Sequence, residues 1–137
     1  MEGEVSTHVV VEAPGMSGHA HTTLLGLSWS SGEPLAVTLT LSAQPDHPAL
    51  PRGEWAVLRD FLRYGVEEPT GDGAVRIRPG GVGIVVLELE GQAKPYVVHV
   101  PAGVICEFLD ETEAVVPAGA EADDDVIDAL IARLLEY

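Results

Sequence analysis

One stretch of the sequence decides the fold: EWAVLRDFLRYGVEEPTGDGAVRIRP, at residues 54–79. Asp60 follows its opening aromatic and aliphatic run and is placed to cap a helix, because its carboxylate can accept hydrogen bonds from the first free backbone N–H groups. Gly65 stands where a helix commonly ends in a left-handed residue. The segment Gly71-Asp72-Gly73 allows positive φ in a tight turn, and residues 75–79 resemble a strand closed by proline. The stretch therefore predicts a strand, a short helix, a turn and a strand.

Trp55, Arg59 and Asp60 in this stretch each allow a structural or a functional interpretation. Trp55 is expected to anchor the core, since a buried indole brings a large apolar area. Arg59 and Asp60 could contact a partner protein. Neighbouring opposite charges are common and individually weak, however, which favours a local ion pair or a helix cap.

Strands dominate the sequence before this stretch. Residues 5–12 are rich in valine, and residues 19–30 place apolar side chains on one face. Residues 35–42 give the clearest alternation, which indicates a strand with one wet face. The segment at 14–18 predicts a turn, and the proline-rich segment at 44–53 predicts a loop.

Two more strands and two helices are expected after residue 79. Residues 82–90 and 94–100 favour an antiparallel hairpin. Apolar residues then repeat at helical spacing from Pro101 to Thr112, and again in a last helix after three consecutive aspartates that begin at Asp123. The connections are too short for parallel crossovers. The predicted fold is therefore α+β: a single domain over residues 1–137, with a mostly antiparallel sheet of about seven strands and two C-terminal helices.

Composition and charge restrict the classes of function. The net charge is −15, from 22 acidic and 7 basic residues, and a surface of that sign repels phosphate and anionic lipid. Five of the seven basic residues lie in residues 52–78, where five acids balance them. No apolar run is long enough to span a membrane, the N-terminus does not resemble a signal peptide, and a single cysteine fits the cytoplasm.

The order and spacing of several segments resemble the SsgA-like proteins, which are sporulation and cell-division regulators of actinomycetes. The central signature is Trp55-x-x-x-Arg59-Asp60-x-Leu62-x-x-Gly65, followed by Pro69-Thr70-Gly71-Asp72-Gly73-Ala74-Val75-Arg76-Ile77-x-Pro79. The segments Glu33-Pro34-Leu35-Ala36-Val37, Phe108-Leu109 with Thr112, and Val116-Pro117-Ala118-Gly119-x-Glu121 fit in the same order. The resemblance covers most of residues 27–135.

This resemblance implies a fold similar to that of the whirly proteins, with a β-meander and a helix repeated twice. It also implies a non-enzymatic regulator that influences septum placement through protein contacts with the division machinery. FtsZ or a family paralogue would be the partner, the chain would act at division septa, and it would form a homotrimer.

No catalytic, cofactor-binding or metal-binding residue is assigned from the sequence. His19 and His21 would lie on one face of a strand as half of a metal site, but no acid or cysteine follows nearby, so surface histidines are favoured. Cys106 as a nucleophile would need a base, and His99 has no evident residue to orient it, so a small buried side chain is favoured. The acids from Asp123 onward lack the glycine and glutamate of an EF-hand loop.

Two other classes of function remain as alternatives. Single-stranded nucleic-acid binding of the whirly type needs a cationic groove and stacking aromatics, whereas aromatic residues make up 5% of this acidic chain. An enzyme that uses Cys106 and a histidine is the weaker alternative.

Overall fold

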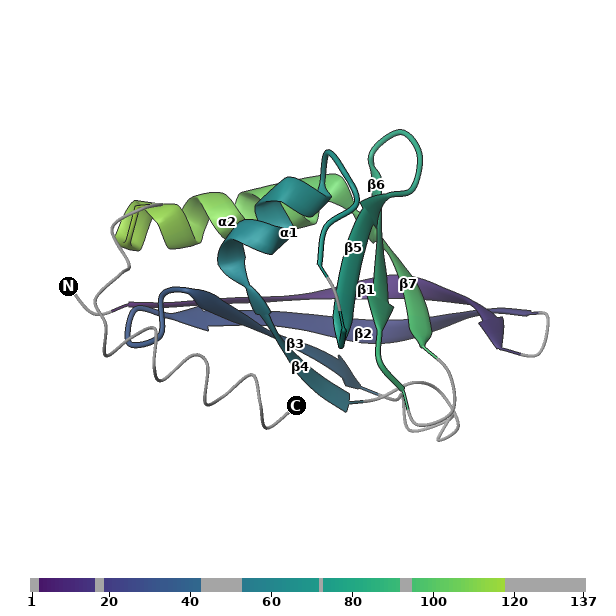
Figure 1. The fold of residues 1–137 in the computed structure, drawn as a ribbon. Coiled ribbons are helices and arrows are strands. Elements are labelled where there is room, and N and C mark those ends of the chain that lie inside the picture. Colours follow the sequence, from purple (N-terminus) through teal and green to yellow (C-terminus); the bar gives the residue numbers. More distant parts are fainter. Residues whose placement is uncertain (1–2, 17–18, 43–52, 72, 92–94, 118–137) are drawn as a thin grey trace.

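The computed structural model describes residues 3–16, 19–42, 53–71, 73–91 and 95–117. Seven strands and two helices form this part of the chain (Figure 1). In chain order they are β1 Glu4–Met16, β2 His19–Ser30, β3 Ala36–Ser42, β4 Gly53–Leu58, α1 Arg59–Gly65, β5 Val75–Pro79, β6 Ile84–Leu89, β7 Tyr96–Pro101 and α2 Ala102–Val115.

All seven strands belong to one antiparallel sheet with the order β4-β3-β2-β1-β7-β6-β5. Four strands precede α1 and three precede α2, so a meander followed by a helix occurs twice. The α+β fold and its seven antiparallel strands are confirmed. The predicted last helix after Asp123 lies outside the described residues.

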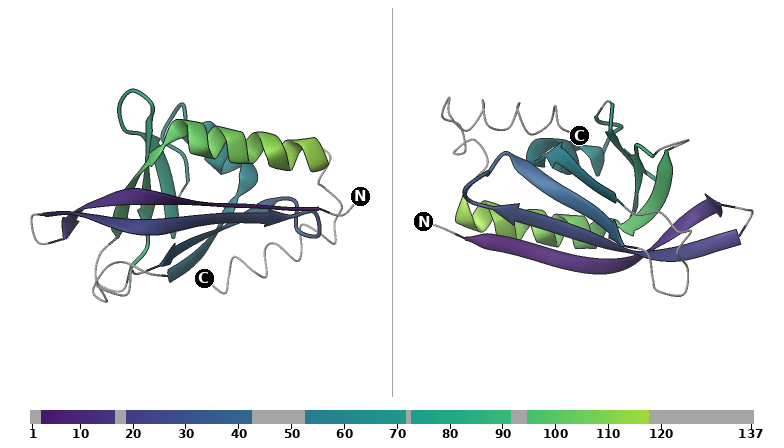
Figure 2. Two further views of the ribbon diagram at one scale, coloured as in Figure 1. Left: turned by 180° about the vertical axis from the view of Figure 1, so that it is seen from behind. Right: turned by 90° about the horizontal axis from the view of Figure 1, so that it is seen from below.

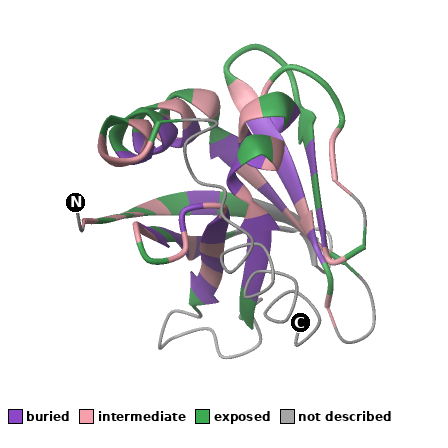
Figure 3. Cartoon of the chain, turned by 60° about the vertical axis from the view of Figure 1, so that its left-hand side comes forward, coloured by how far each residue is buried: buried purple, intermediate pink, exposed green. Residues whose placement is uncertain are grey.

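The core lies between the inner face of the sheet and the two helices (Figures 1 and 3). Strict alternation on β2 and β3 turns one face of each strand inward, as the sequence predicted. The helices contribute a smaller set of fully buried side chains from the face that meets the sheet. The inward residues of these four elements are Thr23, Leu25, Leu27, Trp29, Val37, Leu39, Leu41, Leu62, Ile105, Phe108 and Leu109.

Trp55 connects β4 to the segment between β6 and β7. It lies on β4, is 5% exposed, and donates a hydrogen bond from Nε1 to the Glu90 carbonyl oxygen at 3.0 Å. Its ring also meets that of Tyr96 edge-on, with 6.1 Å between centroids. Because β4 and β5 are the terminal strands and contact one another, the sheet curls almost into a barrel, with Trp55 near the place where β4 and β5 meet.

Helix α1 differs from the sequence prediction at both ends. Leu58, in extended conformation, is the N-cap residue with no side-chain cap, so the prediction of Asp60 as the cap is wrong; Asp60 lies exposed within the first turn. Gly65 is the last helical residue and does not have positive φ. Glycine is required there because a Cβ would collide with Ile77 on β5.

The boundaries of two strands also differ from the prediction. β1 runs through residues 14–16, where a turn was expected, and absorbs Pro14 and Gly15 in an irregular register between Ala13 and Met16. β6 begins at Ile84 instead of Val82, because Gly81 and Gly83 take φ of 118° and 73° in the turn that precedes it.

Candidate functional site

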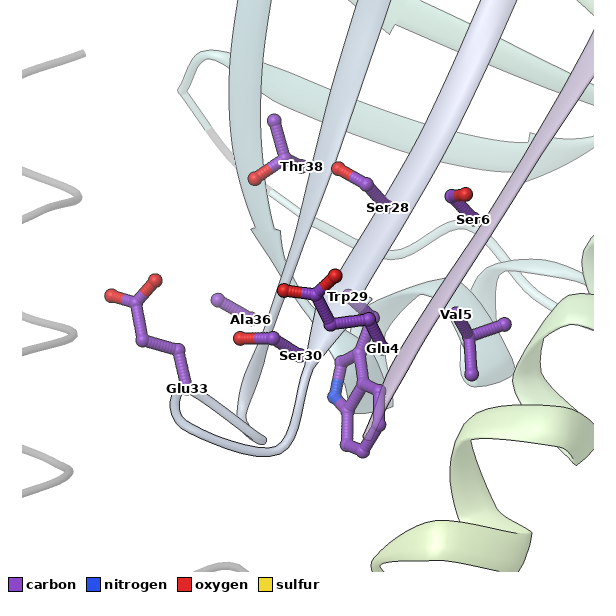
Figure 4. Close-up of a pocket in the computed structure, with 9 residues that line it drawn as sticks. All are labelled: Glu4, Val5, Ser6, Ser28, Trp29, Ser30, Glu33, Ala36 and Thr38. Carbon is purple, nitrogen blue, oxygen red and sulfur yellow. The ribbon is translucent and has the colours of Figure 1, made fainter. Parts of the chain in front are cut away.

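A hollow of about 280 Å³ opens on the face of the sheet opposite the helices (Figure 4). It lies beside the turn between β2 and β3. Six of its nine lining residues are polar, and four of these carry hydroxyl groups. The lining consists of Glu4, Val5, Ser6, Ser28, Trp29, Ser30, Glu33, Ala36 and Thr38.

The hollow has the chemistry of a binding site for hydrogen-bond donors. Its two carboxylates, from Glu4 and Glu33, make it acidic, and its hydroxyl oxygens can accept further hydrogen bonds. Among its lining residues, no histidine, lysine or cysteine is present to activate a hydroxyl group.

Arg59 lies inside the molecule, where α1, β2 and α2 meet. It is 1% exposed, its Nη1 donates to Thr112 Oγ1 at 3.3 Å, and its guanidinium carbon lies 5.5 Å from the ring centroid of Trp29. Thr112 in turn donates to the Leu109 carbonyl oxygen at 2.7 Å. This burial removes Arg59 from direct reach of a partner. The contacts with Trp29 and Thr112 give it a structural role that differs from the local ion pair or helix cap favoured by the sequence.

Arg63 forms the polar contact between α1 and α2. Its Nη2 lies 2.9 Å from Asp110 Oδ1 and 2.8 Å from Glu113 Oε2. Partial burial disfavours the charged guanidinium, but the hydrogen bonds and charges of Asp110 and Glu113 outweigh it and raise the pKa of Arg63 above its usual value. Arg63 therefore stays charged at every pH at which the protein would be studied.

The candidate nucleophile and metal ligands are only partly described by the structure. Cys106 is a free, half-buried thiol on α2, more exposed than the sequence predicted. No group of three or more histidine, cysteine or acidic residues in residues 3–16, 19–42, 53–71, 73–91 and 95–117 is placed to hold a metal. The side chains of His19, His21 and His47 lie outside the described residues. No described helix is long and apolar enough to cross a membrane.

The sequence did not predict the hollow or the setting of Arg59. Alternation on β2 correctly placed Trp29 on the inner face, but that pattern does not say which side chain its ring meets. Trp29, Arg59 and Thr112 come from three distant segments, and only the packing of both helices onto one sheet brings them together.

A protein-family comparison matches residues 24–121 to the family described as Streptomyces sporulation and cell division protein, SsgA. The chain is 31% identical over 113 residues to the sporulation-specific cell division protein SsgB of Streptomyces coelicolor, covering 80% of each chain. It is 35% identical over 115 residues to SsgB of Thermobifida fusca, covering 80% of this chain and 78% of that one.

Two solved structures share the fold. The crystal structure of the SsgA-like sporulation-specific cell division protein of Thermobifida fusca matches with a TM-score of 0.77 at 27% identity, over 96% of this chain and 95% of that one. A second solved structure comes from work on SsgB mutations that correlate to longitudinal cell division during sporulation of Streptomyces coelicolor. It matches with a TM-score of 0.74 at 30% identity, over 88% of this chain and 94% of that one.

Proposed function

The chain belongs to the SsgA family of sporulation and cell division proteins, and from this premise we propose that it regulates sporulation-specific cell division by binding other proteins. Its contribution would be to septum placement, and it would act without catalysing a reaction. The observation that carries the proposal is the match to SsgB proteins in sequence and fold over most of the chain.

The chemistry of the described surface agrees with a binding role. The hollow on the outer face of the sheet offers hydroxyl groups and two carboxylates as hydrogen-bonding groups for a ligand. In the described segments, Cys106 is not part of a group of three or more histidine, cysteine or acidic residues that could hold a metal ion. A protein of this kind would regulate division by binding its partner proteins at a particular place in the cell.

The proposed partner is a component of the division machinery, either FtsZ or a paralogue from the same family. The chain would therefore gather at division septa. The acidic net charge of −15 favours partner surfaces that carry lysine and arginine.

Deletion of the gene in the sporulating organism tests this proposal. We expect irregular septum spacing in sporulating filaments, and restoration of regular spacing by a plasmid copy of the intact chain. A fluorescent fusion should concentrate at sporulation septa. Regular septa and normal spore chains in the deletion strain would contradict the proposal.

We also propose that the chain assembles as a homotrimer. Hydrophobic residues make up 46% of this small domain, and apolar surface that one copy leaves open needs cover from another. Light scattering coupled to size exclusion should give a mass of three chains at micromolar concentration. A mass of one chain under those conditions would contradict it.

A further inference from the structure

The N-terminal half of β1 has an open edge. β1 pairs with β2 from Glu4 onward, whereas its pairing with β7 on the other side is limited to Glu12 opposite His99. No other described strand pairs with that side of Glu4–Val11. In the right-hand view of Figure 2 the N-terminal half of β1, in purple, runs along the margin of the molecule, with α2 behind the strands. The backbone groups on this edge are therefore available to a further strand.

An apolar seam borders this open edge, formed by Val5, Thr7 and Val9 of β1 and by Val104 and Val115 of α2. All five side chains are half-buried. By comparison, the β2 residues that pair with Val5, Thr7 and Val9 are buried. A Cβ on Gly3 would lie 3.1 Å from Val115 Cγ1, which places the end of α2 against the start of β1. The seam is thus a partly covered continuation of the core.

The β1 edge lacks the usual protection against strand addition. Natural edges are commonly interrupted by lysine, proline or a bulge. The nine residues EVSTHVVVE, from Glu4 to Glu12, contain neither lysine nor proline, and their register against β2 is regular. Valine and threonine there favour extended structure.

The charges around the seam select the chemistry of the partner. Glu4 and Glu12 are exposed on the outer face of β1, opposite to the seam, and form its acidic rim. On the seam side, Glu107 and Glu111 of α2 are also exposed and continue the stripe of Val104 at helical spacing. Neither β1 nor α2 contains a lysine or an arginine. An apolar strip with an acidic rim is complementary to a strand in which apolar and basic residues alternate.

We propose that the open edge of β1 binds an extended segment of a partner protein as an additional strand. Apolar side chains of that segment would pack on the seam, and its lysine or arginine side chains would meet the acidic rim. This inference rests on the proposed function in one respect only, namely that the partner is a protein. The same edge of a second copy fits poorly, because two acidic rims repel. The basic strand β5 is already bridged at Ile77 by Thr70.

The test uses the full chain labelled with nitrogen-15 and a synthetic peptide as long as Glu4–Glu12, in which valine alternates with lysine. We expect the largest chemical-shift changes in Glu4–Val11 and α2, and slower amide exchange at alternate residues of Glu4–Val11 in the complex. The same peptide with alternate backbone nitrogens methylated should lose at least about tenfold in affinity, because it cannot complete the strand pairing.

Charge reversal provides the matched comparison on the protein. Glu4→Lys with Glu12→Lys, on the face that the peptide lysines would share, should weaken peptide binding about fivefold to tenfold. Glu67→Lys with Glu68→Lys, an equal change at another exposed site, should change it less than about twofold.

Three outcomes would overturn the inference: equal affinity for the methylated peptide, shift changes centred away from β1, or edge amides already protected by a second copy. None of them bears on the septation phenotype, so failure here leaves the proposed function to its own test.

Discussion

At the scale of single residues, Trp55 contributes more than apolar area. Its indole N–H reaches the carbonyl oxygen that follows β6, and its ring meets Tyr96 at the start of β7. Trp55→Ala should therefore lower the free energy of unfolding by roughly 3–5 kcal/mol, measured by urea denaturation. Trp55→Phe keeps most of the ring and should cost about half as much or less. A Trp55→Ala protein of unchanged stability that had lost its partner would instead make Trp55 a contact residue.

Gly65 and Gly103 form a matched pair of helical glycines. A Cβ at Gly65 would collide with Ile77, whereas a Cβ at Gly103 would meet no atom within 4 Å. Gly65→Ala should therefore destabilise the protein by about 1–3 kcal/mol. Gly103→Ala should stabilise it by up to about 1 kcal/mol, because alanine restricts the unfolded chain. Thermal unfolding of both variants checks this, and equal effects would show that α1 does not pack on β5 as described.

The sequence predicted the burial of single residues better than their contacts. Trp55 was expected in the core because of its ring size, and the apolar face predicted for residues 19–30 includes Trp29; both are buried. The interior position of Arg59 could not be predicted, since a charged side chain next to Asp60 normally lies at the surface. Its burial depends on Trp29 and Thr112, which no local pattern connects to it.

At the scale of elements, Arg63 links the two helices by ion pairs. The side chains of Arg63, Asp110 and Glu113 are 33%, 70% and 29% exposed, so solvent screens these contacts. Arg63→Gln should cost no more than about 1 kcal/mol in low salt, and less at high salt, as measured by denaturant unfolding. Arg78→Gln, which removes a similar surface pair with Glu88 on the sheet, is the control. A cost well above that range, unaffected by salt, would mean that Arg63 has a structural role beyond these pairs.

The sequence predicted which segments form strands or helices more reliably than it predicted where those strands and helices begin and end. Period-two alternation identified β2 and β3 because one face of each packs on the core. The ends of β1 and α1 were misplaced because tertiary contacts override local signals there. β2 pairs with Ala13 and Met16 on either side of Pro14 and Gly15, so that β1 continues through them. α1 begins where the Arg59 amide donates to the Leu35 carbonyl oxygen at 2.7 Å.

At the scale of the whole molecule, the order of strands could not be predicted from the sequence. Every hairpin joins neighbours, but the two meanders meet through the first and last strands, β1 and β7. That junction leaves one edge of the N-terminal half of β1 without a described partner strand, while the other edge pairs with β2. It also brings β4 close to β5, on the side of the sheet where Trp55 lies. Both the seam and the closure of the sheet thus follow from one non-local pairing.

The charge of the whole molecule also decides between a protein partner and a nucleic acid. A nucleic-acid binder gains affinity by releasing counterions from phosphates, and this requires several accessible lysines or arginines. Of the seven basic residues here, Arg59 is buried in the core, and Arg63 and Arg78 are paired with carboxylates. The excess of 15 negative charges adds a repulsive field that low salt strengthens.

We therefore expect no binding to single-stranded DNA or RNA below about 100 µM at physiological salt, which is weaker than ordinary non-specific binders show. Fluorescence anisotropy with labelled oligonucleotides, at low and at moderate salt, measures this directly. A micromolar affinity that falls steeply as salt rises would show that a local basic groove overrides the net charge. In that case single-stranded binding of the whirly type would replace protein binding as the primary activity, and the acidic rim of β1 would have to lie away from the nucleic acid.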